Sequence, residues 1–320
     1  MIYTLTFQPS IDYVVYVEQM ALNKTNRSKR ERVICGGKGL NVSQVLHNLS
    51  VESKALGFVA GFTGVEIEQG MQECGCETDF VHLPEGTSRI NVKIKSMEDG
   101  MISGETEVNG LGPELTHEAI LEMLRKLEAL QSDDIMILAG TVPPTLEFGE
   151  YKSLLKKIHQ SGAELVVDTT GKHLKETLQY HPLLIKPNQE ELGDIFGVEI
   201  GSREEAILYA EKLQKLGARN VLISFAGDGA LLLTEQGHVL QREACSGMVV
   251  NSVGAGDSMV AGFVAGYLKE SINAGEQDKL SEEAYGRVLK MAVAAGSATA
   301  FSEGLAAGAV IQAMMDQVKD

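Results

Sequence analysis

Short runs of apolar residues alternate along most of the chain with longer stretches in which apolar residues recur every three or four positions. The short runs are typical of buried strands, and they occupy 53–59, 134–140, 163–169, 182–187 and 220–227. The longer stretches are typical of amphipathic helices, and the clearest are 116–131 and 203–217. This alternation predicts an α/β fold, with a mostly parallel sheet that helices cover on both faces.

Two segments follow a different pattern, in which apolar and polar residues alternate one by one. Between 89 and 95, Ile90, Val92 and Ile94 face one way, and the residues between them are polar or cationic. The sequence Glu-Asp-Gly at 98–100 is typical of a hairpin turn before a further strand. A similar alternation between residues 11 and 35 predicts that both segments join one small antiparallel sheet, with one apolar and one cationic face.

We therefore expect two parts without a low-complexity linker between them. The predicted core consists of 1–10, 36–88 and 109–320, and the predicted small sheet consists of 11–35 and 89–108. Such a sheet suits a lid over a cleft, a dimer surface, or both.

Composition and charge limit the kinds of partner that the protein can bind. The chain has 320 residues, 44% of them hydrophobic, which suits one large α/β domain with a small appendage. Its 28 Lys and Arg against 44 Asp and Glu give a net charge of −16, which argues against nucleic-acid or anionic-membrane partners. A small phosphorylated ligand remains compatible, because a few cations in one cleft can hold it. The basic run 24–32 fits that role or, alternatively, a solvated strand face.

The cysteines and the first residues indicate the compartment. The four cysteines, at 35, 74, 76 and 245, fit neither a redox nor a zinc motif, so we expect free thiols in a reducing environment. The first twelve residues lack the basic start of a secretory signal, and the longest apolar stretch is too short to span a bilayer. We expect a cytoplasmic protein.

The sequence Gly254-Ala255-Gly256-Asp257 is the most informative short stretch. Glycines before a helix leave backbone N–H groups pointing outward at the positive end of the helix dipole, which favours an anion. A carboxylate beside that anion would repel it if the site only held phosphate. It is useful, however, as a base that takes a proton from a hydroxyl attacking a phosphoryl group. The alternative is an ordinary helix start after a glycine turn.

Further glycine-rich turns could complete such a site. Gly36 and Gly37 allow the backbone to approach a ligand closely, and Lys38 and Asn41 add a charge and an amide. The alternative is a tight turn with a solvated lysine. The stretch 224–232 is either a plain hairpin or the floor of a nucleotide site, to which Ser224 would contribute.

Asn188 and Glu191 follow a predicted strand with the spacing of a helix capping box. They could instead orient a hydrated Mg²⁺ near nucleotide phosphates, because Mg²⁺ usually keeps several of its waters. Other common sites are absent from the sequence. A dinucleotide fingerprint would need Gly where Met259 stands, and the chain has no P-loop, no hydrolase G-x-S-x-G and no zinc-binding histidine pair.

Taken in order, the motifs resemble those of the ribokinase-like, phosphofructokinase-B type carbohydrate kinases, over essentially the whole chain. They are PSID at 9–12, GGKGLN at 36–41, RINVK at 89–93, KPNxxEL at 186–192, SxxGxG at 224–229 and NSVGAGDSMVAGF at 251–263. The resemblance implies a doubly wound α/β domain with a β-sheet lid, and a homodimer formed through the lid. It also implies ATP and Mg²⁺, and phosphorylation of fructose 1-phosphate to fructose 1,6-bisphosphate, with tagatose 6-phosphate as the alternative substrate.

The resemblance also implies a role for each motif residue. Asp257 would be the catalytic base, and Gly254, Ala255 and Gly256 would form the anion hole. The sugar would meet Asp12, Gly36, Gly37 and Asn41, and its phosphate would meet Lys38 and Arg89. ATP would lie along Asn188, Ser224, Gly227 and Gly229, and Mg²⁺ would lie near Glu191 and Asn188, through water.

Two departures from the family pattern touch the substrate side. Gln8 stands where the family usually has Asn, and 139–144 replaces the commoner Ser-Gly-Ser-Leu-Pro-Pro. Both bear on the choice of sugar rather than on the chemistry. Two rival functions are a sugar-phosphate-binding regulator without turnover and a nicotinamide dehydrogenase. Retention of Asp257 argues against the first, and the missing fingerprint argues against the second.

Overall fold

The computed structural model describes residues 1–98, 101–275 and 280–319. Its main feature is a ten-stranded sheet in the order β14-β13-β12-β11-β10-β9-β1-β4-β5, with β6 also pairing with β4. The pairs from β12 to β5 are parallel, and β13 and β14 add antiparallel strands at one edge. The strands are β1 (Ile2–Thr6), β4 (Ser53–Ala60), β5 (Glu77–Thr78), β6 (Val81–Leu83), β9 (Ile135–Ala139), β10 (Glu164–Asp168), β11 (Leu184–Ile185), β12 (Asn220–Ser224), β13 (Ala230–Leu233) and β14 (Val239–Arg242).

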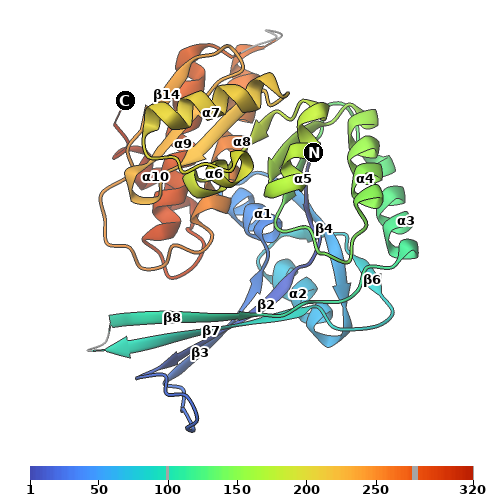
Figure 1. The fold of residues 1–320 in the computed structure, drawn as a ribbon, viewed down its shortest axis with the longest axis vertical. Helices are drawn as coiled ribbons and strands as arrows, with labels where there is room; N and C mark the ends of the chain where they lie inside the picture. Colours follow the sequence, from blue (N-terminus) through green and yellow to red (C-terminus); the bar gives the residue numbers. More distant parts are fainter. Residues whose placement is uncertain (99–100, 276–279, 320) are drawn as a thin grey trace.

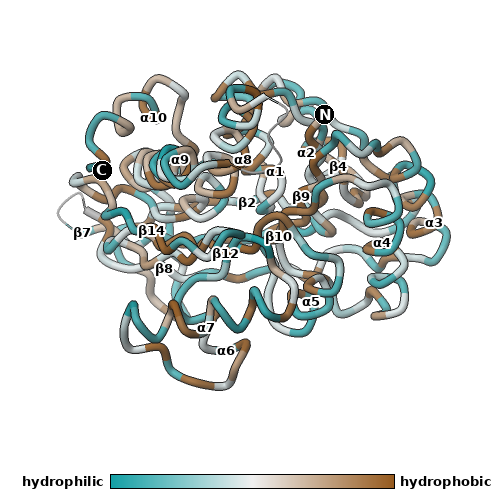
Figure 2. The backbone as a smooth tube through the Cα atoms, turned by 90° about the horizontal axis from the view of Figure 1, so that it is seen from above, coloured by the Kyte–Doolittle hydropathy of each residue, from teal (hydrophilic) through white to brown (hydrophobic). Residues whose placement is uncertain are grey.

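Helices cover both faces of this sheet, as the alternation predicts. They are α1 (Lys38–Asn48), α2 (Gly61–Glu73), α3 (His117–Lys126), α4 (Phe148–Ser161), α5 (Gly171–Thr177), α6 (Gln189–Phe196), α7 (Arg203–Lys215), α8 (Ala255–Ala274), α9 (Glu282–Ala300) and α10 (Gly308–Met315). Alternate residues of β9 show the arrangement. Ile135 and Ile137 pack with residues of α1, α8 and α9, whereas Met136 and Leu138 pack with residues of α3 and α4. Hydrophobic β9 accordingly runs through the middle of the molecule (Figure 2).

The five predicted apolar runs all contain strands. The run 182–187 differs most from expectation, because only Leu184 and Ile185 form a strand there. Prolines at 182 and 187 flank that strand, and a proline has no N–H to donate to a ladder. The predicted helices are confirmed as α3 and α7, although the last turn of the first becomes a short 3₁₀ segment at Leu127–Ala129. No helix within the described residues is long and apolar enough to cross a membrane.

The second sheet extends away from the core and has the order β3-β2-β7-β8 (Figure 1). Its strands are β2 (Ser10–Val17), β3 (Arg30–Gly36), β7 (Arg89–Glu98) and β8 (Met101–Asn109). Each hairpin is antiparallel, as expected, and the two hairpins join through the parallel pair β2–β7. The predicted turn at 98–100 lies outside the described residues beyond Glu98. Of the basic run 24–32, only its end belongs to a strand, because β3 begins at Arg30.

The two faces of this second sheet, called the lid below, differ in exposure. The polar face of β7 is the buried one, with Asn91 at 4% and Lys93 at 8% exposure, whereas Ile90 on the other face is 40% exposed. Pairing across the strands aligns an apolar row on that outer face, formed by Val33, Tyr13, Val92 and Val108. The sequence pattern separates the two faces, but the structure shows that the polar face is turned inward.

Candidate active site

A cleft of about 1050 Å³ lies between the core and the inner face of the lid, and motifs from the whole chain meet in it. The predicted site residues that line it are Asp12, Gly37, Lys38, Asn41, Arg89, Asn188, Glu191, Ser224, Gly227, Gly229, Gly254, Ala255, Gly256 and Asp257. Gly36 lies behind Asp12 instead. A Cβ atom there would stand 2.5 Å from Asp12 Oδ1, so this glycine makes room for that carboxylate.

Asp257 lies in the first turn of α8 and is buried. Gly254 begins the helix with φ of 82°, a left-handed conformation that favours glycine. The first intrahelical bond runs from Ser258 N to Gly254 O at 2.8 Å, so the N–H groups of Gly256 and Asp257 precede it and can bind an anion. The N–H of Ala255 donates to Ser252 O at 3.2 Å. Asn41 fixes the carboxylate by donating from Nδ2 to Asp257 Oδ2 at 2.7 Å.

A second buried carboxylate, which the sequence does not single out, lies beside this group. Asp168 ends β10 and is fully buried, with Lys38 Nζ at 3.0 Å and Lys186 Nζ at 3.5 Å from its Oδ1. A Cβ atom on Gly256 would lie 3.3 Å from Lys186 Nζ, so the glycine turn admits this ammonium group. Lys38, which the sequence predicts to hold the substrate phosphate, therefore already has an anionic partner in the protein.

The electrostatics of the site favour a base that works near neutral pH. Burial, together with the charge of Asp168, raises the pKa of Asp257 to about 6, although Lys38, Asn41 and Lys186 oppose the shift. Burial also disfavours ionisation of Asp168, but its two lysine partners outweigh that effect and hold its pKa below the ordinary value. Asp257 is thus ionised at pH 7 and more basic than a solvated aspartate.

The lid side of the cleft is a network centred on Asp12. Its Oδ1 accepts hydrogen bonds from Ser10 Oγ and Asn91 Nδ2, both at 2.8 Å, and its Oδ2 lies 3.1 Å from Lys93 Nζ. The sequence motifs alone do not assign Asn91 and Lys93 to the site. The signal was present, because both residues alternate with the apolar positions of β7 on the same face as Arg89.

Arg89 stands at the start of β7 and is half-buried. Its Nε atom is buried and has no hydrogen-bond partner among the described residues. Burial lowers the pKa of its guanidinium, and the charge of Asp12 partly offsets this. An anion in the cleft would satisfy a group that the protein leaves unsatisfied.

Asn188 and Glu191 form a helix capping box, which is one of the two structures that their spacing predicts. Glu191 N donates to Asn188 Oδ1 at 2.7 Å, and Asn188 N donates to Glu191 Oε2 at 2.8 Å. Both residues also line the cleft. The described residues hold no cluster of three or more side chains suited to enclose a metal ion. One carboxylate at a cleft suits Mg²⁺, which takes few protein ligands and keeps waters and substrate phosphates.

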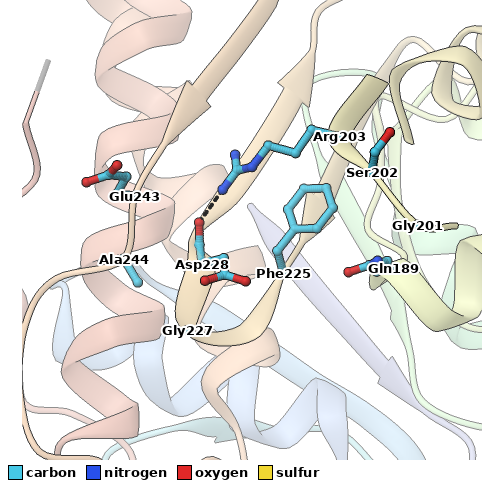
Figure 3. Close-up of a pocket in the computed structure, with 9 residues that line it drawn as sticks. All are labelled: Gln189, Gly201, Ser202, Arg203, Phe225, Gly227, Asp228, Glu243 and Ala244. Carbon is cyan, nitrogen blue, oxygen red and sulfur yellow. Dashed lines mark hydrogen bonds between the residues drawn. The ribbon is translucent and has the colours of Figure 1, made fainter. Parts of the chain in front are cut away.

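The glycine-rich turn of the predicted nucleotide site joins β12 to β13. It contains a short 3₁₀ segment, Ala226–Asp228, and Phe225 N closes it by donating to Gly229 O at 2.9 Å. Arg203, at the start of α7, extends over the Phe225 ring at 4.9 Å and donates to the carbonyl oxygen of Asp228 (Figure 3). A smaller pocket of about 470 Å³ lies on this side of the turn. Arg203 thus stabilises the turn through its contacts with Phe225 and Asp228.

Comparison with known proteins agrees with this geometry. The model of the pfkB family of carbohydrate kinases matches residues 6–311. The 1-phosphofructokinase of Bacillus subtilis is 43% identical over 100% of this chain and 99% of its own length. The D-tagatose-1-phosphate kinase of Bacillus licheniformis is 35% identical over 95% of this chain and 94% of its own.

A solved structure supports the fold independently. Phosphofructokinase-2 from Escherichia coli, in complex with substrates and products, superposes with a TM-score of 0.87 at 23% identity, over 98% of each chain. The family match spans nearly all of the sequence, and the relatives are similar to it along their whole lengths. The protein therefore belongs to the pfkB family of carbohydrate kinases.

Proposed function

We propose that the protein transfers the γ-phosphoryl group of ATP to fructose 1-phosphate and so forms fructose 1,6-bisphosphate. The observation that carries this proposal is the placement of Asp257, buried at the amino end of α8. It faces the same cleft as Arg89, whose Nε has no hydrogen-bond partner in the described part of the chain. The similarity to a 1-phosphofructokinase along the whole chain supports this choice of sugar. A nicotinamide dehydrogenase does not fit a carbohydrate kinase family.

The residues of the cleft suit an in-line transfer. Asp257 accepts the proton of the attacking sugar hydroxyl, and Asn41 keeps its carboxylate in place. The N–H groups of Gly256 and Asp257, with the helix dipole, stabilise the negative charge of the transferring group. When Mg²⁺ is bound, it supplies charge neutralisation at the ATP phosphates, and Asn188 and Glu191 would hold it through water.

A panel of substrates tests the proposal. We expect ADP release to show the highest kcat/KM with fructose 1-phosphate, compared with fructose 6-phosphate, tagatose 1-phosphate, tagatose 6-phosphate and free fructose. Product mass should increase by one phosphoryl group for each ADP. Binding of a sugar phosphate without any ADP formation would instead support the regulator that the sequence left open.

Tagatose 1-phosphate is the second candidate, because a relative that is 35% identical bears the name D-tagatose-1-phosphate kinase. Tagatose differs from fructose only in the orientation of the hydroxyl group at C4. Tagatose 6-phosphate, the alternative from the sequence, differs also in the position of the phosphate. The panel separates these three sugars, and a clear preference for either tagatose ester would overturn the choice of fructose 1-phosphate.

We propose further that the protein is a homodimer in the cytoplasm and that the outer face of the lid forms the interface. The apolar row of Val33, Tyr13, Val92 and Val108 supports this, because Val33 and Val108 are 58% and 61% exposed in the single chain. Val33→Asp should convert a dimer to a monomer in sedimentation velocity. Leu208→Asp, at a similarly exposed position on α7, is the matched control. A wild-type monomer, or a dimeric Val33→Asp, would contradict this interface.

A further inference from the structure

We propose that Asp168 is a positioning residue for phosphoryl transfer, which holds Lys38 and Lys186 beside Asp257 as one charge-balanced cluster. This inference rests on the proposed function, because it assigns a role within the same transfer. Neither the sequence motifs nor the comparisons give Asp168 any role.

The contacts of Asp168 support a role beyond the stability of the fold. It is fully buried, Lys186 is 4% exposed, and both lysine ammonium groups approach the same oxygen, Oδ1. Its other oxygen, Oδ2, has no hydrogen-bond partner among the described residues. A buried carboxylate with one oxygen unsatisfied is costly, so apolar packing would stabilise this strand end better. What the carboxylate does provide is a fixed position for two long, flexible side chains.

Both lysines are held where the transferring group must pass. Lys38 belongs to the same first turn of α1 as Asn41, which bonds Asp257 Oδ2. Lys186 Nζ lies against Gly256, whose N–H belongs to the proposed anion site. With Asp168 and Asp257 ionised and both lysines charged, the cluster is neutral. When Asp257 accepts a proton, the cluster gains one positive charge. Asp168 is then the one carboxylate in the cluster that remains ionised, so the two lysine charges are more available to the oxygens of the transferring phosphoryl group.

Asp168 also affects the ionisation of Asp257 through space. The charged or titratable groups around the cleft are, within the described residues, Lys38 on α1, Asp168 on β10, Lys186 after β11, Glu191 on α6, Cys245 after β14, and Asp12, Arg89, Lys93 and Glu107 on the lid. After burial, the charge of Asp168 is the largest contribution that raises the pKa of Asp257. Removal of this charge should therefore lower the pKa of Asp257 and shift the acid limb of the kcat–pH profile to lower pH.

The test is Asp168→Asn in the full-length protein, with the best substrate of the panel. We expect kcat to fall about tenfold and the acid limb to move to lower pH. Asp134→Asn is the matched control, because Asp134 is also buried and ion-paired, but with the N-terminal amine at the opposite end of the sheet. This control should lower the melting temperature and leave both kcat and the acid limb unchanged.

Asp168→Glu keeps the charge but displaces it. It should lower kcat without shifting the acid limb. If Asp168→Asn does not fold, Asp168→Glu is the variant that tests the proposal. Three results would each overturn the proposal. They are a wild-type kcat in either Asp168 variant, an unshifted acid limb in Asp168→Asn, and equal effects on kcat and the acid limb in Asp134→Asn. Wild-type turnover separately tests the proposed function. If the wild type turns over no sugar of the panel, ATP affinity by calorimetry replaces kcat, and Asp168→Asn must weaken it whereas Asp134→Asn must not.

Discussion

Replacement of Asp257 by Asn should lower kcat by about 10²–10⁴-fold, with the KM for ATP little changed. The substitution keeps the size of the side chain, and its amide oxygen can still accept the hydrogen bond from Asn41 Nδ2. The position of the first turn of α8 should therefore be retained. What is lost is a group that can take the proton of the sugar hydroxyl, which is why the loss should fall on kcat rather than on binding.

Steady-state kinetics over a range of pH test this assignment. For the wild type, kcat should fall as the pH drops through about 6, because the pKa of Asp257 is raised to about 6 and the base must be ionised. The residual activity of Asp257→Asn should lack this acid limb. Asp194→Asn, an exposed carboxylate on α6, is the control and should behave as the wild type. Near-normal turnover by Asp257→Asn would remove Asp257 from the role of base.

Replacement of Arg89 by Ala should lower kcat/KM for the sugar phosphate by about 10–10²-fold. The guanidinium is half-buried on the inner face of the lid, and its Nε has no hydrogen-bond partner among the described residues. A phosphate can accept two hydrogen bonds from such a group, and a charge-assisted contact contributes about 1.5–3 kcal/mol. The sequence predicts Lys38 as a second contact, but the pairing of Lys38 with Asp168 holds it beside Asp257, so the contact with the sugar's own phosphate is assigned to Arg89 alone.

The comparison that matters is between phosphorylated and free sugars. Arg89→Ala should penalise fructose 1-phosphate, fructose 6-phosphate and tagatose 6-phosphate, and it should hardly change the poor activity on free fructose. Lys29→Ala removes an exposed cation just before β3 and should leave all four values unchanged. An equal penalty on free fructose, or free fructose as good a substrate as the best ester, would rule out a phosphate contact at Arg89.

The residues that sequence reasoning found are those whose local pattern is unusual. Two glycines shortly before Asp257 are unusual for an ordinary helix start, so this stretch indicates an anion site by itself. Asp168 has no such local signal, because it ends a common apolar strand. Its partners lie 130 residues before it and 18 residues after it. Only the fold brings them together, because β11 lies beside β10 and α1 packs against β1 and β9.

The lid shows a different reason for incomplete prediction. Alternation along β7 separates two faces, but a period of two carries no information on which face meets the core. An apolar face usually packs inward, yet here the face with Asn91 and Lys93 is the buried one. The polar partner that reverses the usual preference is Asp12 on β2, and the parallel pairing of β2 with β7 is a property of the fold rather than of either segment.

The alternation of β7 also limits how this chain can change during evolution. Substitutions at Ile90, Val92 or Ile94 alter the outer face and leave the cleft untouched. Deletion of a single residue just after Arg89, in contrast, would exchange the two faces over the rest of the strand and carry Asn91 and Lys93 out of the cleft. The length of this strand should therefore be under stronger selection than the identity of its outer side chains, and new assembly surfaces can arise on the lid at no cost to substrate recognition.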